Sequence, residues 1–193
     1  MEKQVKKSLP AEIKDLPGLV KRSCGEIKRI GSLTGAAMLA ALNVILHQLT
    51  VIISLTQQIS FAFITVGISG MLYGPMLTGM IGIATDILKY IVKPNGGFFP
   101  GFTLSEFVLG FIYGLFLYKK EVTLARVFCA QLTVTLVIDL TLTSLWLSMM
   151  YGQAFIVLVG ARLVKNIVML PVKTAILYFL AKKVSEIRVR RLA

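Results

Sequence analysis

The stretch most suited to ligand chemistry is an apolar run near the C-terminus, residues 153–183, that holds three internal cations. Arg162, Lys165 and Lys173 all lie well inside it. A cation in hydrocarbon costs at least a few kcal/mol, so such residues normally face a protein interior or a wet cavity. Together with Asn166 they follow helical spacings, which places them on one face of a helix. The sequence therefore predicts a donor-rich wall of a chamber that binds a flat, polar and acidic ligand.

The composition identifies the class of protein. Apolar residues make up 56% of the 193-residue chain and charged residues 16%, and the mean hydropathy is +0.79. A soluble domain carries about 25% charged residues, so the chain is expected to be an all-α integral membrane protein with one compact bundle and no separate soluble domain. The net charge of +12 could suggest nucleic acid as a partner. Because the cations cluster at the ends of apolar spans, we expect the lipid bilayer as their partner and no nucleic acid.

The apolar runs predict six transmembrane helices. The run at 61–92 would measure about 48 Å as a single helix, which exceeds a hydrocarbon core of about 30 Å. The pair Gly74-Pro75 near its middle favours two short spans joined by a turn. The other four predicted spans cover 30–55, 103–118, 124–150 and 153–183.

The distribution of Lys and Arg orients these spans. With the N-terminus inside, the basic groups within 3–29, 119–126 and 182–191 all fall on the cytoplasmic side, and only Lys89 and Lys93 fall near the outer face. The positive-inside rule therefore favours six spans with both termini cytoplasmic. The expected organisation is a basic surface segment, a six-helix membrane domain and a basic cytoplasmic tail, at 1–29, 30–183 and 184–193.

Small residues recur at a spacing of four in several spans, which lets helices approach closely in lipid. For the glycine pairs Gly70/Gly74 and Gly110/Gly114 we expect packing within the bundle. For the first span, packing within the bundle and docking against a separate membrane subunit both remain open. The alanines concerned are Ala36, Ala37, Ala40 and Ala41.

The link at residues 93–102 combines Gly and Pro with three aromatic residues, Phe98, Phe99 and Phe102. A bent outer loop that folds over a pocket and stacks its rings on a planar ligand would explain both features. Anchoring of the loop among lipid headgroups is the alternative. Trp146, near the outer end of the fifth span, is open to the same two interpretations.

Buried carboxylates need partners as well. Counted along straight helices, Asp139 and Lys165 fall at nearly the same depth, which predicts a structural pair that leaves Arg162 and Asn166 for a ligand. His47 is the only histidine, and neither a nucleotide-binding P-loop nor a metalloprotease motif occurs in the sequence. We therefore expect no metal, no cofactor and no enzymatic activity.

Residues 30–183 resemble the S-components of energy-coupling-factor (ECF) vitamin transporters. The resemblance lies in the six spans, the Ala-rich first span, the Gly-Pro turn and the loop before the fourth span. A narrower resemblance to the folate-specific members rests on two runs, GGFFPGFTLSEFVLGFIYGLFLYKK at 96–120 and ARLVKNIVMLPV at 161–172.

The resemblance implies a subunit of a bacterial cell-membrane uptake system that captures folate but does not pump alone. It implies docking through the first helix onto the transmembrane coupling subunit EcfT, which joins two ATP-binding-cassette ATPases. Folate would lie under the loops at 56–60, 94–102 and 151–154. The side chains then expected to contact folate are Arg162, Lys165, Asn166, Phe98, Phe99, Phe102, Thr103 and Trp146.

Three alternatives stay open at this point. Another vitamin could be the ligand; riboflavin fits better than thiamine, whose positive charge Arg162 and Lys165 would repel. A membrane-embedded enzyme of lipid metabolism would need a reactive cluster that the sequence does not show. A purely structural bundle would satisfy all its polar residues internally.

Overall fold

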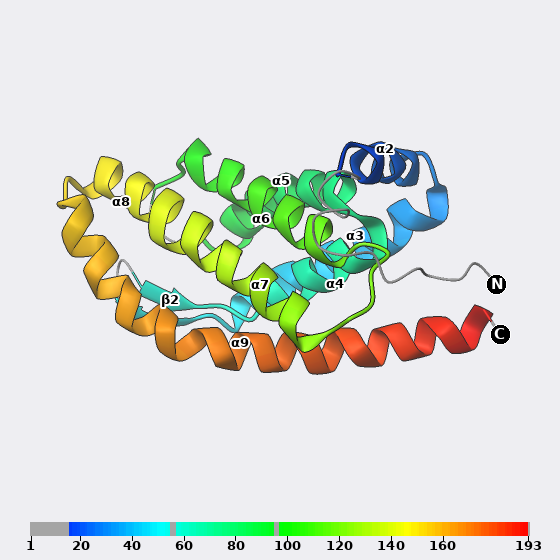
Figure 1. Ribbon diagram of the computed structural model, residues 1–193. Helices are drawn as coiled ribbons and strands as arrows, with labels where there is room; N and C mark the ends of the chain where they lie inside the picture. The colour runs from blue at the N-terminus through cyan, green and yellow to red at the C-terminus, as the bar shows by residue number, and fades with distance from the viewer. Residues whose placement is uncertain (1–15, 55–56, 95–96, 193) are drawn as a thin grey trace.

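The computed structural model describes residues 16–54, 57–94 and 97–192 and is almost entirely helical (Figure 1). The predicted surface location of residues 1–15 lies outside this described part. The elements, in chain order, are α2 (Leu16–Ile27), α3 (Ile30–Gln48), β1 (Val51–Ser54), β2 (Gln57–Ile59), α4 (Phe63–Tyr73), α5 (Pro75–Val92), α6 (Pro100–Leu117), α7 (Leu124–Val134), η1 (Thr135–Leu142), α8 (Thr143–Tyr151) and α9 (Phe155–Leu192).

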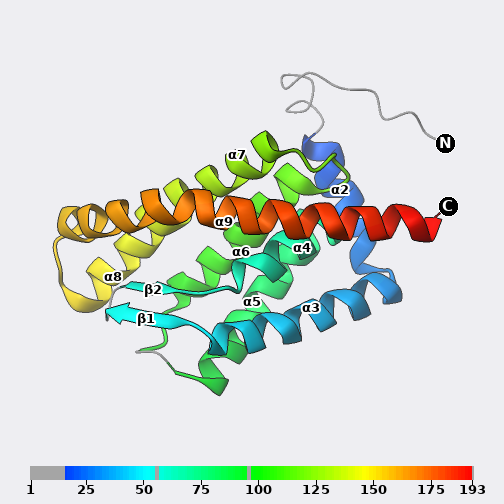
Figure 2. The ribbon, with the colours of Figure 1, turned by 90° about the horizontal axis from the view of Figure 1, so that it is seen from below.

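The helices form an elongated bundle whose two ends differ. The β1–β2 hairpin and the α8–α9 connection lie at one end, where α8 also ends (Figures 1 and 2). Helix α2 and the last turns of α9 lie at the other end, and α9 runs along the length of the bundle between the two (Figure 1). We call the end with the hairpin the hairpin end and the other the basic end.

Within the described residues, five helical segments are long and apolar enough to cross a membrane: α3, α5, α6, the continuous stretch Leu124–Tyr151, and Phe155–Ile187 within α9. Helix α4 is apolar but has only 11 residues. Large apolar side chains lie exposed along α3 and α9, among them Ile45 at 61% and Val164 at 68% exposure. An apolar exterior of this kind is what a bilayer solvates, so the fold agrees with the predicted class of membrane protein.

The first predicted span, 30–55, is too long. Helix α3 ends at Gln48, and β1 pairs antiparallel with β2, with Val51 opposite Ile59. The physical reason is the run from Thr50 to Ile53, in which all four residues are β-branched and prefer an extended backbone. The bundle is therefore not purely helical. The hairpin extends the short helix α4, the second predicted span, at the hairpin end.

The predicted break at Gly74-Pro75 is confirmed. Helix α4 ends at Tyr73, Gly74 takes the positive φ of +83° that favours glycine, and Pro75 begins α5. Helices α5 and α6 then approach very closely, because a Cβ added at Gly110 would lie 2.7 Å from the carbonyl oxygen of Thr78. The predicted packing role of that glycine within the bundle is thereby confirmed.

Helix α2 is fixed to this Gly-Pro turn. Ser23 is fully buried, and its hydroxyl accepts a hydrogen bond from the backbone N–H of Met76. The Glu26 carboxylate accepts hydrogen bonds from the hydroxyls of Ser32, at 2.6 Å, and Tyr118, at 3.2 Å. Burial alone would raise the pKa of Glu26, but these hydrogen bonds, together with the positive charges of Arg29 and Lys119, outweigh it and hold the pKa below its ordinary value.

The fifth predicted span, 124–150, contains a feature that its sequence pattern does not reveal. Eight of its residues, Thr135–Leu142, form a π-helix between α7 and α8. A π turn joins residue i to i+5 instead of i+4, so it widens the helix, and such turns occur frequently at functional sites. Asp139 lies within this segment.

The sixth predicted span, 153–183, begins two residues early and ends too soon. Helix α9 covers 38 residues, and it continues without a break across the predicted boundary between membrane domain and tail at 183/184. At about 1.5 Å per residue it measures about 57 Å, so it extends beyond a single membrane thickness at the basic end.

Candidate ligand-binding site

The predicted polar face of α9 is turned toward the bundle. Arg162 and Asn166 are buried, at 7% and 3% exposure, although both side chains are polar. Val164 and Val168, on the opposite side, are exposed at 68% and 63%. The helical spacing of the polar residues therefore predicted the correct inward face.

Asp139 joins the π-helix to this face of α9. Arg162 Nη1 donates a hydrogen bond to the main-chain carbonyl oxygen of Asp139 at 3.2 Å, and Lys173 Nζ lies 3.5 Å from Asp139 Oδ2. The predicted pair of Asp139 with Lys165 is therefore wrong: the carboxylate pairs with Lys173, two turns further along α9. The prediction assumed a uniform α-helical rise, and the π turns at Asp139 change its position relative to α9.

Lys165 contacts the hairpin instead. Its Nζ donates a hydrogen bond to the carbonyl oxygen of Gln58 in β2 at 3.3 Å. Asn166, next to it, has a side-chain Nδ2 that is buried and without a hydrogen-bond partner among the described residues. A buried donor without a partner costs free energy, so this position is one that a ligand acceptor would stabilise.

The predicted aromatic residues form a second group, between α6 and α8. The ring of Phe99 lies 5.6 Å from Trp146 and 6.2 Å from Phe102, centroid to centroid. Trp146 Nε1 donates a hydrogen bond to Ser105 Oγ at 3.0 Å, so the indole points toward α6 and not outward to a headgroup layer. Phe98 lies apart from this cluster: it is 49% exposed, with its ring 5.3 Å from Tyr90.

The end of α5 carries charged partners of α6 that the sequence reasoning missed. Thr103 Oγ1 donates a hydrogen bond to Asp86 Oδ2 at 2.6 Å, and Lys89 Nζ lies 3.0 Å from Glu106 Oε1. Lys89 was expected to fall near the outer membrane face; its side chain is only 5% exposed and forms this partly buried ion pair. The spacing of three residues between Asp86 and Lys89, repeated between Thr103 and Glu106, is the signal that could have indicated this pairing.

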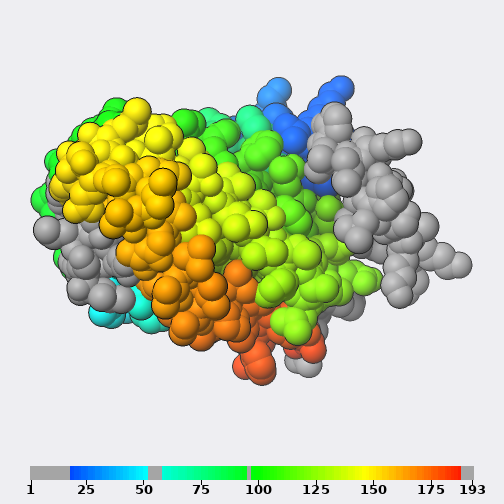
Figure 3. Space-filling view, turned by 60° about the vertical axis from the view of Figure 1, so that its left-hand side comes forward, coloured from blue at the N-terminus to red at the C-terminus, as the bar shows by residue number. Residues whose placement is uncertain are grey.

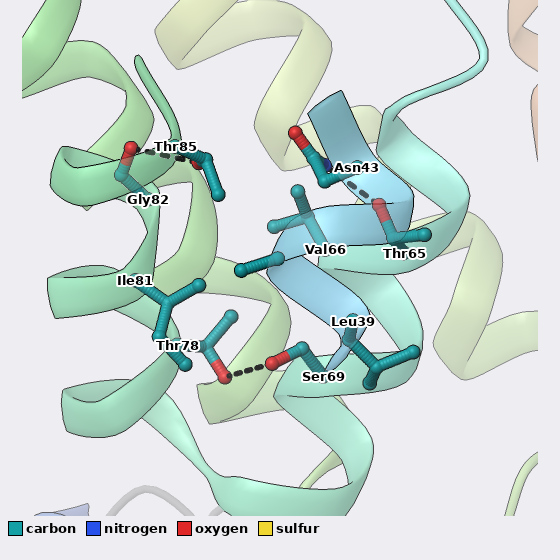
Figure 4. A pocket seen from close by; sticks show the side chains of 10 residues that line it. Leu39, Asn43, Thr65, Val66, Ser69, Thr78, Ile81, Gly82 and Thr85 are labelled. Atoms are coloured by element: carbon teal, nitrogen blue, oxygen red, sulfur yellow. Dashed lines mark hydrogen bonds between the residues drawn. The ribbon is translucent and has the colours of Figure 1, made fainter. Parts of the chain in front are cut away.

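A small cavity lies between α3, α4 and α5, and both apolar and polar side chains line it (Figure 4). Asn43 projects into it from α3 and donates a hydrogen bond to Thr65 Oγ1 at 2.6 Å, and Ser69 and Thr78 are joined below it (Figure 4). The free volume is about 10 Å³, which is enough for about one water molecule and far too small for a vitamin. This cavity is thus separate from the predicted chamber.

The four alanines predicted as a docking surface do not share one environment. Ala36 is fully buried against the bundle, so it cannot contact a partner in this arrangement, and Ala40 is half-buried beside the small cavity. Ala37 and Ala41 are exposed, next to Met38, which is 71% exposed. The exposed face of α3 is therefore narrower than the alanine pattern predicted.

The hairpin end brings the predicted groups to one region of the molecule. Helix α8 packs against both α6, which carries the aromatic group, and α9, which carries the donors. Figure 3 shows this end from outside, with α8 and the first turns of α9 forming most of its surface and the hairpin beneath them. The arrangement offers aromatic faces on one side and buried hydrogen-bond donors on the other, which suits a ligand with rings and acidic groups.

Comparison with known proteins identifies the family of this chain. Residues 31–181 match the family model described as "ECF transporter, substrate-specific component". The chain is 36% identical over 163 residues to the folate transporter FolT of Clostridium novyi (strain NT), covering 84% of this chain and 95% of that protein. It is also 36% identical over 150 residues to the folate transporter FolT of Leuconostoc mesenteroides, covering 75% and 80% of the two chains.

A solved structure also resembles the fold of this chain. The crystal structure of FolT bound with folic acid aligns with a TM-score of 0.75 at 36% identity, covering 80% of this chain and 95% of that chain. The family is one of transporter components and not of enzymes. The extent of the family match, together with these relatives, establishes that the chain belongs to the substrate-specific components of ECF transporters.

Proposed function

We propose that this protein is the folate-binding capture subunit of a bacterial ECF uptake system. The observation that carries the proposal is its similarity, at 36% identity and over 80% of the chain, to a FolT structure that contains folic acid. The two folate transporters of similar sequence support it further. The protein itself supplies a matching chemistry, since aromatic side chains and buried donors gather at the hairpin end.

Folate combines a flat pterin, a benzoyl ring and an acidic glutamate, and each part has a counterpart among the candidate residues. Phe99, Phe102 and Trp146 offer ring faces for stacking. Arg162 offers a planar fork of donors that suits a carboxylate or a ring edge, and Asn166 offers a buried amide. Further candidates are Lys165, Phe98 and Thr103.

We propose that six segments cross the bilayer, with both termini cytoplasmic. Helix α4 measures only about 16 Å, so the β1–β2 hairpin would complete that crossing at the hairpin end. Non-helical backbone at this depth is tolerated where it lines a cavity. The basic side chains of α2 and of the α6–α7 connection at Lys119-Lys120 would face the cytoplasm, which accords with the positive-inside rule.

The exposed face of α3 is the candidate surface for the transmembrane subunit EcfT, through which two ATP-binding-cassette ATPases would supply energy. Ala37 and Ala41 leave this face shallow, which lets a partner helix approach closely. Ala41→Trp should therefore abolish coupled uptake while leaving folate binding intact. Val164→Trp, on the lipid-facing side of α9, is the matched control and should change neither property.

Reconstitution tests the capture role. Liposomes that contain only this chain should bind labelled folate without accumulating it. Liposomes that also contain the coupling subunit and both ATPases should accumulate folate when ATP is enclosed. Accumulation by the isolated chain would refute the assignment as a capture subunit, and absence of folate binding would refute the ligand.

A further inference from the structure

Helix α2 lies at the basic end, where it runs across the direction of α9 (Figures 1 and 2). Only Lys28 and Arg29 separate it from α3, whose first residue, Ile30, is 83% exposed. An apolar side chain so exposed at the start of a membrane span lies against the hydrocarbon. Because the connection is so short, α2 lies at the level of the lipid headgroups, as interfacial amphipathic helices do.

One side of α2 packs on the bundle, and the opposite side is basic and open. Ser23 is fully buried and fixes the packed side to the Gly-Pro turn. Lys21 and Arg22 lie on the opposite side and are exposed. Gly18 and Gly25 share this side, and a Cβ added at either glycine would have no neighbouring atom within 4 Å. An anionic group can therefore reach both cations without meeting an obstructing side chain.

The turn after α6 extends this basic side of α2. Tyr118 joins the two segments, because its hydroxyl donates a hydrogen bond to Glu26 of α2 at 3.2 Å. Lys119, the next residue, is exposed and lies close enough to Glu26 to act on its charge. Glu26 itself is half-buried, and the cation that it pairs with is Arg29, at 3.7 Å.

The exposed cations of this region outnumber the carboxylates that could neutralise them. Among the described residues, the side chains of Lys21, Arg22 and Lys28 form no ion pair and no hydrogen bond. Together with Lys119 they make up what we call the α2 surface. A cluster of cations beside the end of a membrane span attracts negatively charged lipids of the cytoplasmic leaflet.

We propose that the α2 surface is a binding site for anionic phospholipid headgroups. The headgroup phosphate accepts charge-assisted hydrogen bonds from Lys and Arg, and the net negative charge of the lipid matches the unpaired cations. Because α2 is fixed to the Gly-Pro turn, its cations are held in place before the lipid arrives, which lowers the entropic cost of binding. This surface lies at the opposite end from the proposed folate site and does not depend on the identity of the vitamin.

A fluorescent label on α2 tests the proposal. Cys24 of α2 is exposed, and Cys129→Ala leaves it as the only cysteine to carry an environment-sensitive label. The full chain in neutral detergent, at an ionic strength of about 0.15 M, is titrated with short-chain phosphatidylglycerol. We expect a saturable signal, at least about tenfold weaker binding of phosphatidylcholine with the same chains, and no signal with glycerol phosphate. Lys21→Gln/Arg22→Gln should weaken phosphatidylglycerol binding about 25-fold, since each cation near an anionic lipid contributes about fivefold.

Matched variants separate this site from a general effect of charge. Lys21→Arg/Arg22→Lys should bind phosphatidylglycerol within twofold of wild type. Lys182→Gln/Lys183→Gln, which removes two exposed cations from α9 at the same end, should also stay within twofold. Lys28→Gln, with an expected loss of about fivefold, keeps the proposal testable if the double variant of α2 does not fold. Equal binding of both lipids, equal weakening by the α9 variant, or binding of glycerol phosphate as tight as that of the lipid would overturn the proposal.

Discussion

The partly buried ion pair between Lys89 and Glu106 makes the α5–α6 contact sensitive to the replacement of either charged residue by a neutral one. Lys89 Nζ lies 3.0 Å from Glu106 Oε1, and the two side chains are 6% and 24% exposed. With an effective dielectric constant of about 20, Coulomb's law gives an attraction of about 5.5 kcal/mol at that separation. Desolvation offsets much of this, but removal of one partner leaves an uncompensated buried charge, which costs about 3–5 kcal/mol. Because Glu106 retains some exposure, we expect Glu106→Gln to cost about 3 kcal/mol.

Thermal unfolding of the detergent-solubilised chain, followed by the fluorescence of its single tryptophan, measures this effect. Glu106→Gln should lower the midpoint by several degrees. The double variant Lys89→Met/Glu106→Leu should recover most of the loss, because it removes both charges together. A single variant as stable as wild type, or a double variant less stable than the single one, would refute the reasoning.

Three further outcomes follow from described contacts. Because the pKa of Glu26 is lowered in the folded protein, its stabilising contribution is complete above pH 4.5, the ordinary pKa of the group, and is lost as the pH falls through the pKa in the folded protein. The difference in unfolding midpoint between wild type and Glu26→Gln should therefore disappear in acid. A difference that stays constant with pH would contradict this. Asn43→Ala should cost about 1–3 kcal/mol in the same assay, since it removes the donor to the carbonyl oxygen of Ala62 and to Thr65 Oγ1 at the start of α4. An unchanged midpoint would argue against that role. Gly110→Ala should lower the unfolding midpoint strongly, because its Cβ would lie 2.7 Å from the carbonyl oxygen of Thr78. Gly160→Ala is the control, since a Cβ there has no neighbouring atom within 4 Å. Equal effects of the two substitutions would contradict the close approach of α5 and α6.

Much of the helical framework could be predicted because membrane spans have strong local signals. The apolar runs located α5, α6 and α9, and Gly74-Pro75 located the α4–α5 turn. The inward face of α9 followed from helical periodicity alone. Each of these depends on residues close together in the sequence.

What sequence could not provide depends on local backbone choices and on pairing between elements. The β-branched run after Gln48 is as apolar as a helix, so hydropathy did not separate it from α3. The π-helix leaves no distinct pattern, and it changes which cation of α9 Asp139 meets. Partners such as Lys89 and Glu106 are 17 residues apart, and only the packing of α5 on α6 joins them.

Calorimetric titration of the purified chain with folic acid, using riboflavin and thiamine as controls, tests the central claim most directly. One-to-one binding of folic acid tighter than about 1 μM, corresponding to about 8 kcal/mol, with strong weakening by Arg162→Ala, is the predicted result. Preference for riboflavin or thiamine over folic acid would keep the family and contradict the ligand. No binding of folic acid by protein shown to be folded would contradict the capture function.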